Sequence, residues 1–393
     1  MSRPARIGVN LLWLVPGVVG GSEEATLAAL RAAGDEVAAA GLELVVFALP
    51  ALLEVAPDLA DRFEVATVDL SGANKVMRVL AENTALRRTA STRTIQLMHH
   101  GGGVIPPGVP IGATLAIHDT QPLDLPQNFG VVKRRYLGTM IGRSARSARL
   151  VTVPSEFVRQ RLIEHTHVDA RKVVVVPWTV PPAPTVGGDA IDAVRSQYGL
   201  DRPYVLYPAI AYAHKNHAVL LDAFARLVGD ATPGGPTDVD LVLTGGPGPL
   251  DDEIAARSAQ ADLAGRVHRL GRIPRSALET LLAGAAAVAV PSRYEGFGLP
   301  AIEALRSGRP TVVANAGSLP EIVGDGALIV APNDVAGWAA ALEAVLSDAD
   351  LRARLVVDGP AVAASFTPHR TAAGLIDVWT RALADVSTPR TNQ

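Results

Sequence analysis

The sequence predicts an α/β protein with two doubly wound domains that face each other across a cleft. Short apolar runs alternate with longer amphipathic segments rich in alanine and leucine, which is typical of repeated β-α units. A proline- and glycine-rich stretch, Pro177–Gly188, interrupts this series and cannot sustain a helix, so we interpret it as a linker. With 393 residues, 48% of them hydrophobic, the chain is long enough for two cores built on parallel sheets buried on both faces.

The first domain is expected at residues 1–180. The apolar start of the chain is similar to a signal peptide, but Asn10 and Pro16 interrupt it, so we interpret it as a first strand followed by a glycine loop. The seven strands expected in this domain are Ile7–Leu14, Leu44–Leu49, Val65–Leu70, Thr94–Met98, Ala113–Ile117, Leu150–Val153 and Val173–Val176.

The second domain is expected at residues 190–365, followed by an amphipathic terminal helix over Phe366–Leu383. Because ligands of open parallel sheets bind outside the carboxyl ends of the strands, we expect the chemistry at those ends. The six strands expected here are Tyr204–Tyr207, Asp240–Thr244, Val267–Leu270, Ala285–Val290, Thr311–Ala314 and Ala327–Val330.

Composition excludes several classes of function. The chain has no cysteine, which rules out disulfides and thiol chemistry and argues against an oxidising compartment, so we expect a cytoplasmic protein. A net charge of −3 argues against a general nucleic-acid binder. No segment offers about 18 uninterrupted apolar residues, so we expect no membrane span. The charge is uneven: residues 1–180 carry +3 and residues 181–393 carry −6.

The most informative segment is Pro291–Glu303, in which Glu295 and Glu303 are separated by seven residues. The apolar run before it predicts a buried strand, and Pro300 is well placed as the first residue of a helix. Glycines on the intervening loop let backbone N–H groups approach a ligand, and a helix N-terminus favours an anion such as a diphosphate. Carboxylates are good acceptors for sugar hydroxyls. The segment thus suits a nucleotide-sugar, although an ordinary strand–loop–helix with solvated acids would give the same spacing.

The whole string resembles the Glu-x7-Glu motif of the retaining nucleotide-sugar glycosyltransferases of family 4, which have the GT-B fold of two Rossmann-like domains. The continuations Ala304–Pro310 and Gly317–Ile322 are also similar to that family. The resemblance implies that Glu295 contacts the transferred sugar and Glu303 the ribose of the donor. It further implies that the terminal helix, about 366–385, crosses back onto the N-terminal domain. The backbone implied to hold sugar and phosphate is that of Gly296, Phe297, Gly298 and Leu299.

Lys215 follows the strand Tyr204–Tyr207 and precedes an apolar helical pattern. A lysine at a helix entrance is placed to meet a diphosphate as a point charge, although a solvated lysine beside a capping Asn216 is the plainer interpretation. The run resembles the Lys-Asn element of family 4, which implies that Lys215 neutralises the leaving diphosphate. One departure stands out: many members carry an arginine six residues before that lysine, where this chain has Ala209.

Other site residues are also implied by the resemblance. His118 and Asp119 end a buried strand and look like the family's His-Asp element, in which the histidine reaches the donor sugar, although a satisfied histidine and a capping aspartate are equally compatible. Gly20 and Gly21 resemble the glycine loop that closes on phosphate and acceptor, and a tight turn explains them as well. The backbone of Ile273 is a candidate contact for the base.

Two further patterns bear on partners. Asp238-Val-Asp240 is similar to a metal-binding Asp-x-Asp, but it precedes a strand and so lies at the wrong end of a sheet; we expect no metal and no cofactor. The segment Val131–Arg149 carries six basic residues among apolar ones. Such a segment can dock on anionic lipid headgroups, or can be a surface helix with solvated arginines.

These observations together predict a metal-independent, retaining hexosyltransferase that uses a nucleoside-diphosphate sugar, with GDP-mannose as one candidate donor. The expected acceptor is a glycan or a lipid-linked glycan, bound by the N-terminal domain, with the inner face of the membrane as the place of a lipid-linked one. A sugar-nucleotide epimerase or a glycan phosphorylase shares the architecture. A non-catalytic, nucleotide-sugar-binding subunit of a glycan synthase complex is the alternative from another class. An epimerase would turn over donor without acceptor, and a subunit would bind nucleotide without turnover.

Overall fold

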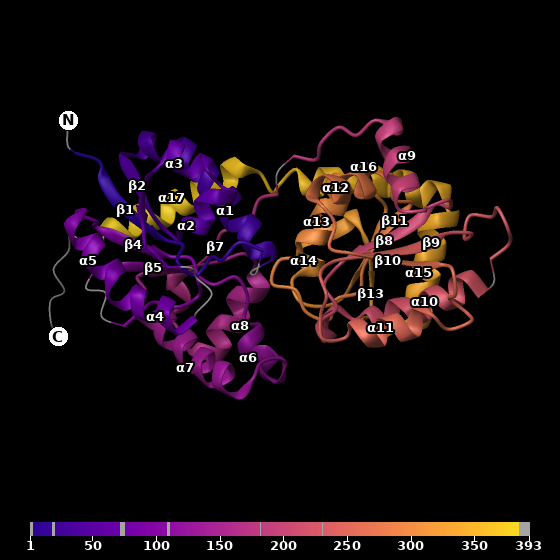
Figure 1. Ribbon diagram of the computed structural model, residues 1–393, viewed down its shortest axis with the longest axis horizontal. Coiled ribbons are helices and arrows are strands. Elements are labelled where there is room, and N and C mark those ends of the chain that lie inside the picture. Colours follow the sequence, from indigo (N-terminus) through magenta and orange to yellow (C-terminus); the bar gives the residue numbers. More distant parts are fainter. Residues whose placement is uncertain are drawn as a thin grey trace. The chain divides into compact units, whose positions relative to one another are not determined.

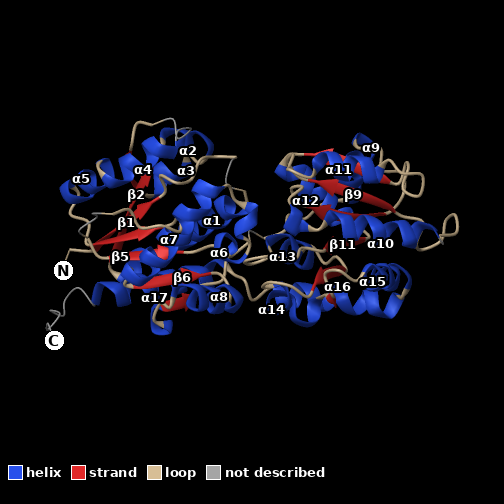
Figure 2. Cartoon of the chain, turned by 90° about the horizontal axis from the view of Figure 1, so that it is seen from below, coloured by secondary structure: helices blue, strands red, loops and turns tan. Residues whose placement is uncertain are grey.

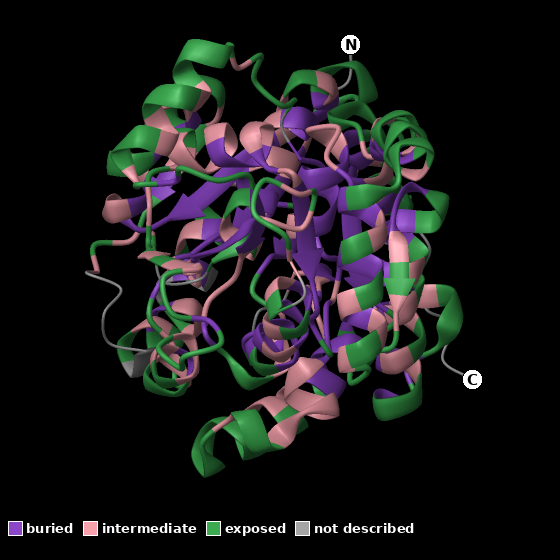
Figure 3. Cartoon of the chain, turned by 90° about the vertical axis from the view of Figure 1, so that its right-hand side faces the viewer, coloured by how far each residue is buried: buried purple, intermediate pink, exposed green. Residues whose placement is uncertain are grey.

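A computed structural model describes residues 3–17, 20–70, 75–107, 111–180, 182–229 and 231–384. The chain divides into two compact units. Unit 1 comprises Met1–Pro181 together with Phe366–Gln393, and unit 2 comprises Pro182–Ser365. In each unit, helices lie on both sides of a central sheet (Figures 1 and 2). The central strands of each sheet are buried, and the outer faces of the helices are exposed (Figure 3).

The described part of unit 1 contains a parallel sheet of seven strands in the order β3-β2-β1-β4-β5-β6-β7. The strand order reverses between β1 and β4, which makes that position the topological switch point of the sheet. The strands are β1 Ala5–Asn10, β2 Leu42–Ala48, β3 Glu64–Thr67, β4 Leu97–His100, β5 Ala113–Ala116, β6 Leu150–Val153 and β7 Val173–Val175.

The helices of unit 1 cover the two faces of this sheet (Figure 2). They are α1 Gly21–Glu36, α2 Pro50–Val55, α3 Asp58–Arg62, α4 Lys75–Asn83, α5 Ala85–Thr92, α6 Gln121–Asp124, α7 Val131–Ser147, α8 Glu156–Thr166 and α17 Pro368–Ala384.

Unit 2 repeats the same topology. Its described residues form a parallel sheet of six strands in the order β10-β9-β8-β11-β12-β13, with the switch point between β8 and β11. The strands are β8 Tyr204–Pro208, β9 Asp240–Thr244, β10 Val267–Gly271, β11 Ala287–Val290, β12 Thr311–Ala314 and β13 Leu328–Val330. The helices are α9 Gly188–Gln197, α10 His217–Gly229, α11 Asp251–Ser258, α12 Arg275–Gly284, α13 Leu299–Arg306, α14 Leu319–Val323, α15 Val335–Ser347 and α16 Ala349–Ala363. The prediction of two doubly wound α/β domains is confirmed.

Every expected strand is present, but several bounds differ from the prediction. The first strand ends at Asn10 rather than Leu14 because the Asn10 side chain accepts a hydrogen bond from the N–H of Leu12 and turns the chain out of the sheet. The fourth strand begins at Leu97 rather than Thr94, since Thr94 has φ 54° and cannot join a ladder. Polar residues at strand ends thus set limits that the apolar pattern alone does not show.

The terminal helix α17 packs against α1 and the sheet of unit 1, where it appears as a yellow helix among indigo elements (Figure 1). Leu375, Val378 and Trp379 are buried in the same apolar cluster as β1 and β2. Side-chain hydrogen bonds fasten its start: Thr371 Oγ1 donates to Pro177 O, and Thr179 Oγ1 donates to Phe366 O.

The predicted linker Pro177–Gly188 needs correction at both ends. Its first residues are packed into unit 1, where Thr179 and Val180 are almost fully buried. Its last residue, Gly188, begins α9. The first part of this stretch is extended backbone that hydrogen bonds to Phe366 and Thr371 hold in place.

The Asp-x-Asp pattern at the start of β9 is explained by ion pairs. Asp238 and Asp240 both contact the guanidinium of Arg266, and Asp240 also contacts His268. These carboxylates lie at the amino end of their strand, away from the switch point. In the described part of the chain, no helix is long and apolar enough to cross a membrane.

We predict that Trp379→Ala lowers the free energy of unfolding of unit 1 by about 3–5 kcal/mol, because a large buried ring is lost and leaves a cavity. Urea unfolding of the full chain measures this change. Val132→Ala on the same unit is the control: Val132 is exposed, so the expected change is below about 0.5 kcal/mol. Equal effects of the two substitutions would contradict the packing described for α17.

Candidate active site

Two loops meet at the switch point of the unit 2 sheet. One follows β8 and carries His214, Lys215 and Asn216, and the other follows β11 and carries Glu295. In doubly wound sheets this position is where ligands bind, because the loops on either side diverge to opposite faces. The topology therefore brings together residues that are 80 positions apart in the sequence.

Lys215 and Glu295 form an ion pair at this position. Lys215 Nζ donates to Glu295 Oε1 at 2.6 Å, and the two side chains are only 18% and 10% exposed. A largely buried carboxylate needs such a partner, since an unpaired buried charge is strongly destabilising. The pair places a cation and a hydrogen-bond acceptor side by side at the switch point.

The backbone of Glu295 is held by the loop before α14. Ser318 donates to Glu295 O through both its N–H and its hydroxyl group. Gly317 has φ 60°, and a Cβ placed on it would lie 2.6 Å from Glu295 O. Only glycine fits this close approach in the left-handed region.

Asn216 and Tyr207 fix the Lys215 loop. Asn216 has φ 59°, and its amide donates to the carbonyls of Pro291 and Pro332, which lie at the ends of β11 and β13. Asn216 therefore tethers the Lys215 loop to the ends of these two strands. It is not the helix cap that the plainer interpretation of the sequence expects. The Tyr207 hydroxyl donates to Lys215 O, so both sides of the lysine are anchored.

Glu303 lies on the second turn of α13 and is also paired with a cation. Arg275 Nη1 lies 2.6 Å from Glu303 Oε1. Arg275, at the start of α12, is a residue that the sequence analysis missed, because nothing in its local pattern links it to Glu303. Each acid of the Glu-x7-Glu segment thus has its own basic partner.

The loop between the two acids enters α13 through Gly298, which has φ 89°. Leu299 is the first residue of α13, so the expectation that Pro300 begins this helix is wrong by one residue. The side chain of Phe297 is buried, with 1% exposed, which leaves only its backbone for a ligand. Gly296 and Leu299 are partly exposed.

A pocket of about 220 Å³ lies beside Ala209, at the carboxyl ends of β8, β9 and β10. His217, Gly245 and Gly246 contribute to its lining. Burial lowers the pKa of His217 to about 4, so the ring is neutral at pH 7. The sequence analysis did not single out His217, because it stands at the start of a predicted helix. Ile273 is partly exposed on the loop that follows β10.

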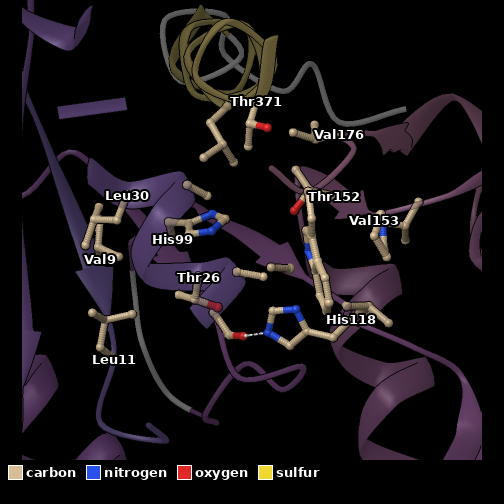
Figure 4. A pocket seen from close by; sticks show the side chains of 18 of the residues that line it. Val9, Leu11, Thr26, Leu30, His99, His118, Thr152, Val153, Val176 and Thr371 are labelled. Atoms are coloured by element: carbon tan, nitrogen blue, oxygen red, sulfur yellow. Dashed lines mark hydrogen bonds between the residues drawn. The ribbon is translucent and has the colours of Figure 1, made fainter. Parts of the chain in front are cut away.

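His118 lies in unit 1 at the carboxyl end of β5, on the edge of a second pocket of about 60 Å³ (Figure 4). Its ring is close to two indoles, with centroids 5.2 Å from Trp13 and 5.4 Å from Trp178. His118 Nε2 donates to Gly101 O at 2.7 Å, and burial lowers the pKa of His118 to about 4. The imidazole is therefore neutral, and its Nδ1 is an acceptor rather than a cation.

The remaining predicted residues of unit 1 lie at the start of α1 and after β5. Gly20 has φ 79° and precedes α1, and Gly21 is the first residue of that helix. Asp119 Oδ1 accepts from the N–H of Gln121, which makes it a turn residue, as the plainer interpretation of His118-Asp119 requires.

The family of the chain follows from comparison with known proteins. Residues 191–360 match the family described as "Glycosyl transferases group 1", and residues 27–183 match "Glycosyltransferase Family 4". The chain belongs to the family 4 GT-B glycosyltransferases. It is thus an enzyme of glycosyl transfer, as the Glu-x7-Glu segment predicts.

Relatives of this glycosyltransferase include the O-antigen chain mannosyltransferase B of Escherichia coli, which is 29% identical over 69% of this chain and 70% of that protein. The D-inositol 3-phosphate glycosyltransferase of Nocardia farcinica is 34% identical over 61% of this chain. The match spans 54%, about half, of that relative.

Solved structures share the fold of this glycosyltransferase at low sequence identity. The sucrose-phosphate synthase of Thermosynechococcus elongatus superposes with a TM-score of 0.76 at 20% identity, covering 97% of this chain and all of that one. HepE of Anabaena, solved with UDP and glucose, gives a TM-score of 0.75 at 19% identity, covering 96% of this chain and 100% of that one.

We predict that Gly317→Ala weakens nucleotide binding about tenfold or more, because the added Cβ would push Glu295 away from Lys215. The thermal shift caused by UDP, GDP or dTDP measures binding. Gly265→Ala is the matched control, since Gly265 also has positive φ but has no atom near its Cβ position. If both variants bind nucleotide as the unchanged protein does, Gly317 has no part in shaping the site.

Proposed function

We propose that this enzyme transfers a hexose from a nucleoside-diphosphate sugar to a glycan or lipid-linked acceptor, with retention of configuration and without a metal ion. The observation that supports this proposal most strongly is the Lys215–Glu295 pair at the switch point of unit 2. The donor would bind in unit 2 and the acceptor in unit 1. The resemblance to retaining members of family 4 supports the stereochemistry.

In this mechanism the donor diphosphate competes with Glu295 for the Lys215 ammonium group. Lys215 then stabilises the negative charge that develops on the departing diphosphate, a role in which preorganised charge is most effective. Glu295, released from the lysine, accepts hydrogen bonds from hydroxyls of the transferred sugar. Glu303 would bind the ribose, and the backbone of Gly296–Leu299 would hold sugar and phosphate.

The reaction would proceed on one face of the sugar. The acceptor oxygen bonds to the anomeric carbon as the bond to the diphosphate oxygen breaks, and that oxygen takes the acceptor proton. His118 would position the transferred sugar as a neutral hydrogen-bonding group, because its pKa of about 4 leaves it uncharged at pH 7.

Two neighbouring features would complete the donor site. The pocket beside Ala209, with Gly245 and Gly246 in its lining, lies next to the Lys215 loop and suits part of the nucleotide. Ile273, on the loop after β10, would meet the base. GDP-mannose is the first donor to test, since the Escherichia coli relative is named as a mannosyltransferase.

We predict that Lys215→Ala and Glu295→Ala each reduce transfer by about 100-fold or more, the loss expected when a group that stabilises the transition state is removed. Transfer is followed with GDP-, UDP- and dTDP-hexoses, with and without EDTA. Glu253→Ala is the control, since Glu253 is an exposed acid on α11 of the same unit. Near-normal turnover in both site variants would contradict the assignment.

The same assay separates the alternatives. Conversion of donor without acceptor would favour an epimerase, and nucleotide binding without turnover on any acceptor would favour a non-catalytic subunit. Loss of activity with EDTA would contradict metal independence.

A lipid-linked acceptor would also require contact with a membrane, and α7 is the segment that we propose for it. The residues that begin α7 are exposed on all sides, including Val131, Val132 and Tyr136. They flank Lys133, Arg134 and Arg135, and no acidic residue occurs from 125 to 155. Exposed apolar groups beside cations suit the surface of an anionic bilayer.

We predict that the full chain sediments with vesicles containing phosphatidylglycerol but much less with vesicles of phosphatidylcholine alone. Replacing Lys133, Arg134 and Arg135 by glutamine should abolish this preference, because each cation contributes to the attraction by an anionic surface. Replacing Arg195, Arg202 and Arg226 of unit 2 in the same way is the charge-matched control. Equal sedimentation of both triple variants would contradict a role for α7.

A further inference from the structure

The ion pair of Glu303 belongs to a cluster of charged side chains on α12 and α13. These two helices lie side by side in unit 2 (Figures 1 and 2). Arg275 Nη1 lies 2.6 Å from Glu303 Oε1, and Arg275 Nε donates to Glu279 Oε1 at 2.8 Å. The guanidinium group of Arg275 is therefore held between an acid of its own helix and the second acid of the Glu-x7-Glu segment.

Arg306, one turn further along α13, is the second cation of this cluster. Burial lowers the pKa of Arg306, the Glu303 carboxylate opposes this shift, and the charge of Arg275 adds to it. Arg306 thus lies within electrostatic range of both members of the ion pair. Only 9% of the Glu303 side chain is exposed. Because hydrogen bonds between ionised groups are strong and directional, a buried carboxylate that faces two cations is fixed in its orientation.

The position of Arg275 in the chain connects this cluster with the proposed contact to the base. Gly271, with φ 63°, turns the chain out of β10, and Ile273 lies on the loop that follows. Arg275 comes two residues later, as the first residue of α12. A side-chain ion pair therefore joins the loop proposed to meet the base to the acid proposed to meet the ribose. Base and ribose are adjacent parts of one nucleoside, so both contacts must be held at a fixed separation.

The pairing with Arg275 does not prevent Glu303 from binding a ligand. The two oxygens of an ionised carboxylate offer about four acceptor sites, and the contact between Arg275 Nη1 and Oε1 uses one of them. A ribose hydroxyl can donate to the same carboxylate while the ion pair stays in place. A carboxylate that is already oriented loses less conformational freedom when the ligand binds, which raises the affinity for that ligand.

We propose that Arg275 is a positioning residue that aims the Glu303 carboxylate at the ribose hydroxyls of the nucleotide, and that Glu279 holds Arg275 in place. This inference rests on the proposed function and identifies the residues that determine recognition of the nucleotide's own sugar. Arg275 acts through Glu303 and not by touching the nucleotide. Its effect is therefore specific to nucleotides that carry ribose hydroxyls, whereas a phosphate contact or a structural role would affect all nucleotides alike.

The test compares a nucleotide with its analogue that has no hydroxyl on the 2′ or 3′ carbon. Thermal shift with UDP, GDP and dTDP selects the nucleotide, and isothermal titration calorimetry on the full chain measures both affinities. We expect the unchanged protein to bind the analogue about tenfold or more weakly, because hydrogen bonds to a charged acceptor are lost. Arg275→Gln should weaken the nucleotide but not the analogue, so that the two affinities agree within about threefold.

Three further variants complete the series. Arg275→Lys keeps the positive charge and should restore part of the difference between nucleotide and analogue. Glu279→Gln leaves Arg275 and Glu303 in place and should reduce the difference less than Arg275→Gln does. Arg257→Gln is the matched control, because Arg257 on α11 of the same unit is also held between two acids. This control should retain the full difference.

The outcomes distinguish the inference from the function on which it rests. An undiminished difference between nucleotide and analogue in Arg275→Gln would overturn the inference, and so would an equal loss of affinity for both. Equal binding of nucleotide and analogue by the unchanged protein would overturn it as well. If Arg275→Gln melts at a lower temperature than the unchanged protein, Glu279→Gln decides, and an undiminished difference in that variant is the contradicting result. Failure of all three nucleotides to bind would instead overturn the proposed function.

Discussion

The ion pair between Lys215 and Glu295 is the interaction on which the proposed donor site depends. The two opposite charges neutralise each other in a mostly buried position. A nucleoside-diphosphate sugar would offer each group a new partner. Its phosphates can bind the ammonium group of Lys215, and its hydroxyls can donate hydrogen bonds to the carboxylate of Glu295. Neither charge then has to be buried alone at any stage. Arg275 and Glu303 form a second pair that follows the same logic.

The fold explains why these residues are in contact. Each sheet reverses its strand order at one position, and the loops there separate and leave room for a ligand. In unit 2 the loops after β8 and β11 carry Lys215 and Glu295, and in unit 1 the strands β1 and β4 end in Asn10 and His100. Glycine at position 317 and the asparagine tether at 216 hold the unit 2 loops at the required distance.

Much of the fold could be predicted from the sequence because apolar runs and helix-forming segments alternate so regularly. Strand ends could not, since they depend on single polar contacts such as that of Asn10 with Leu12. In the candidate site, Lys215, Glu295 and His118 stand in recognisable strings. Arg275 and His217 do not: Arg275 is linked to the site by Glu303, and His217 by the pocket at the strand ends, and only the folded chain brings these residues together.

The most direct test of the account is a crystal structure of the full chain with the nucleoside-diphosphate sugar that stabilises it best. We predict that a phosphate oxygen lies within hydrogen-bonding distance of Lys215 Nζ and that the sugar hydroxyls contact Glu295. The distance between Lys215 Nζ and Glu295 Oε1 should then exceed the 2.6 Å described here. A bound nucleotide-sugar elsewhere, with the Lys215–Glu295 pair intact, would contradict the account.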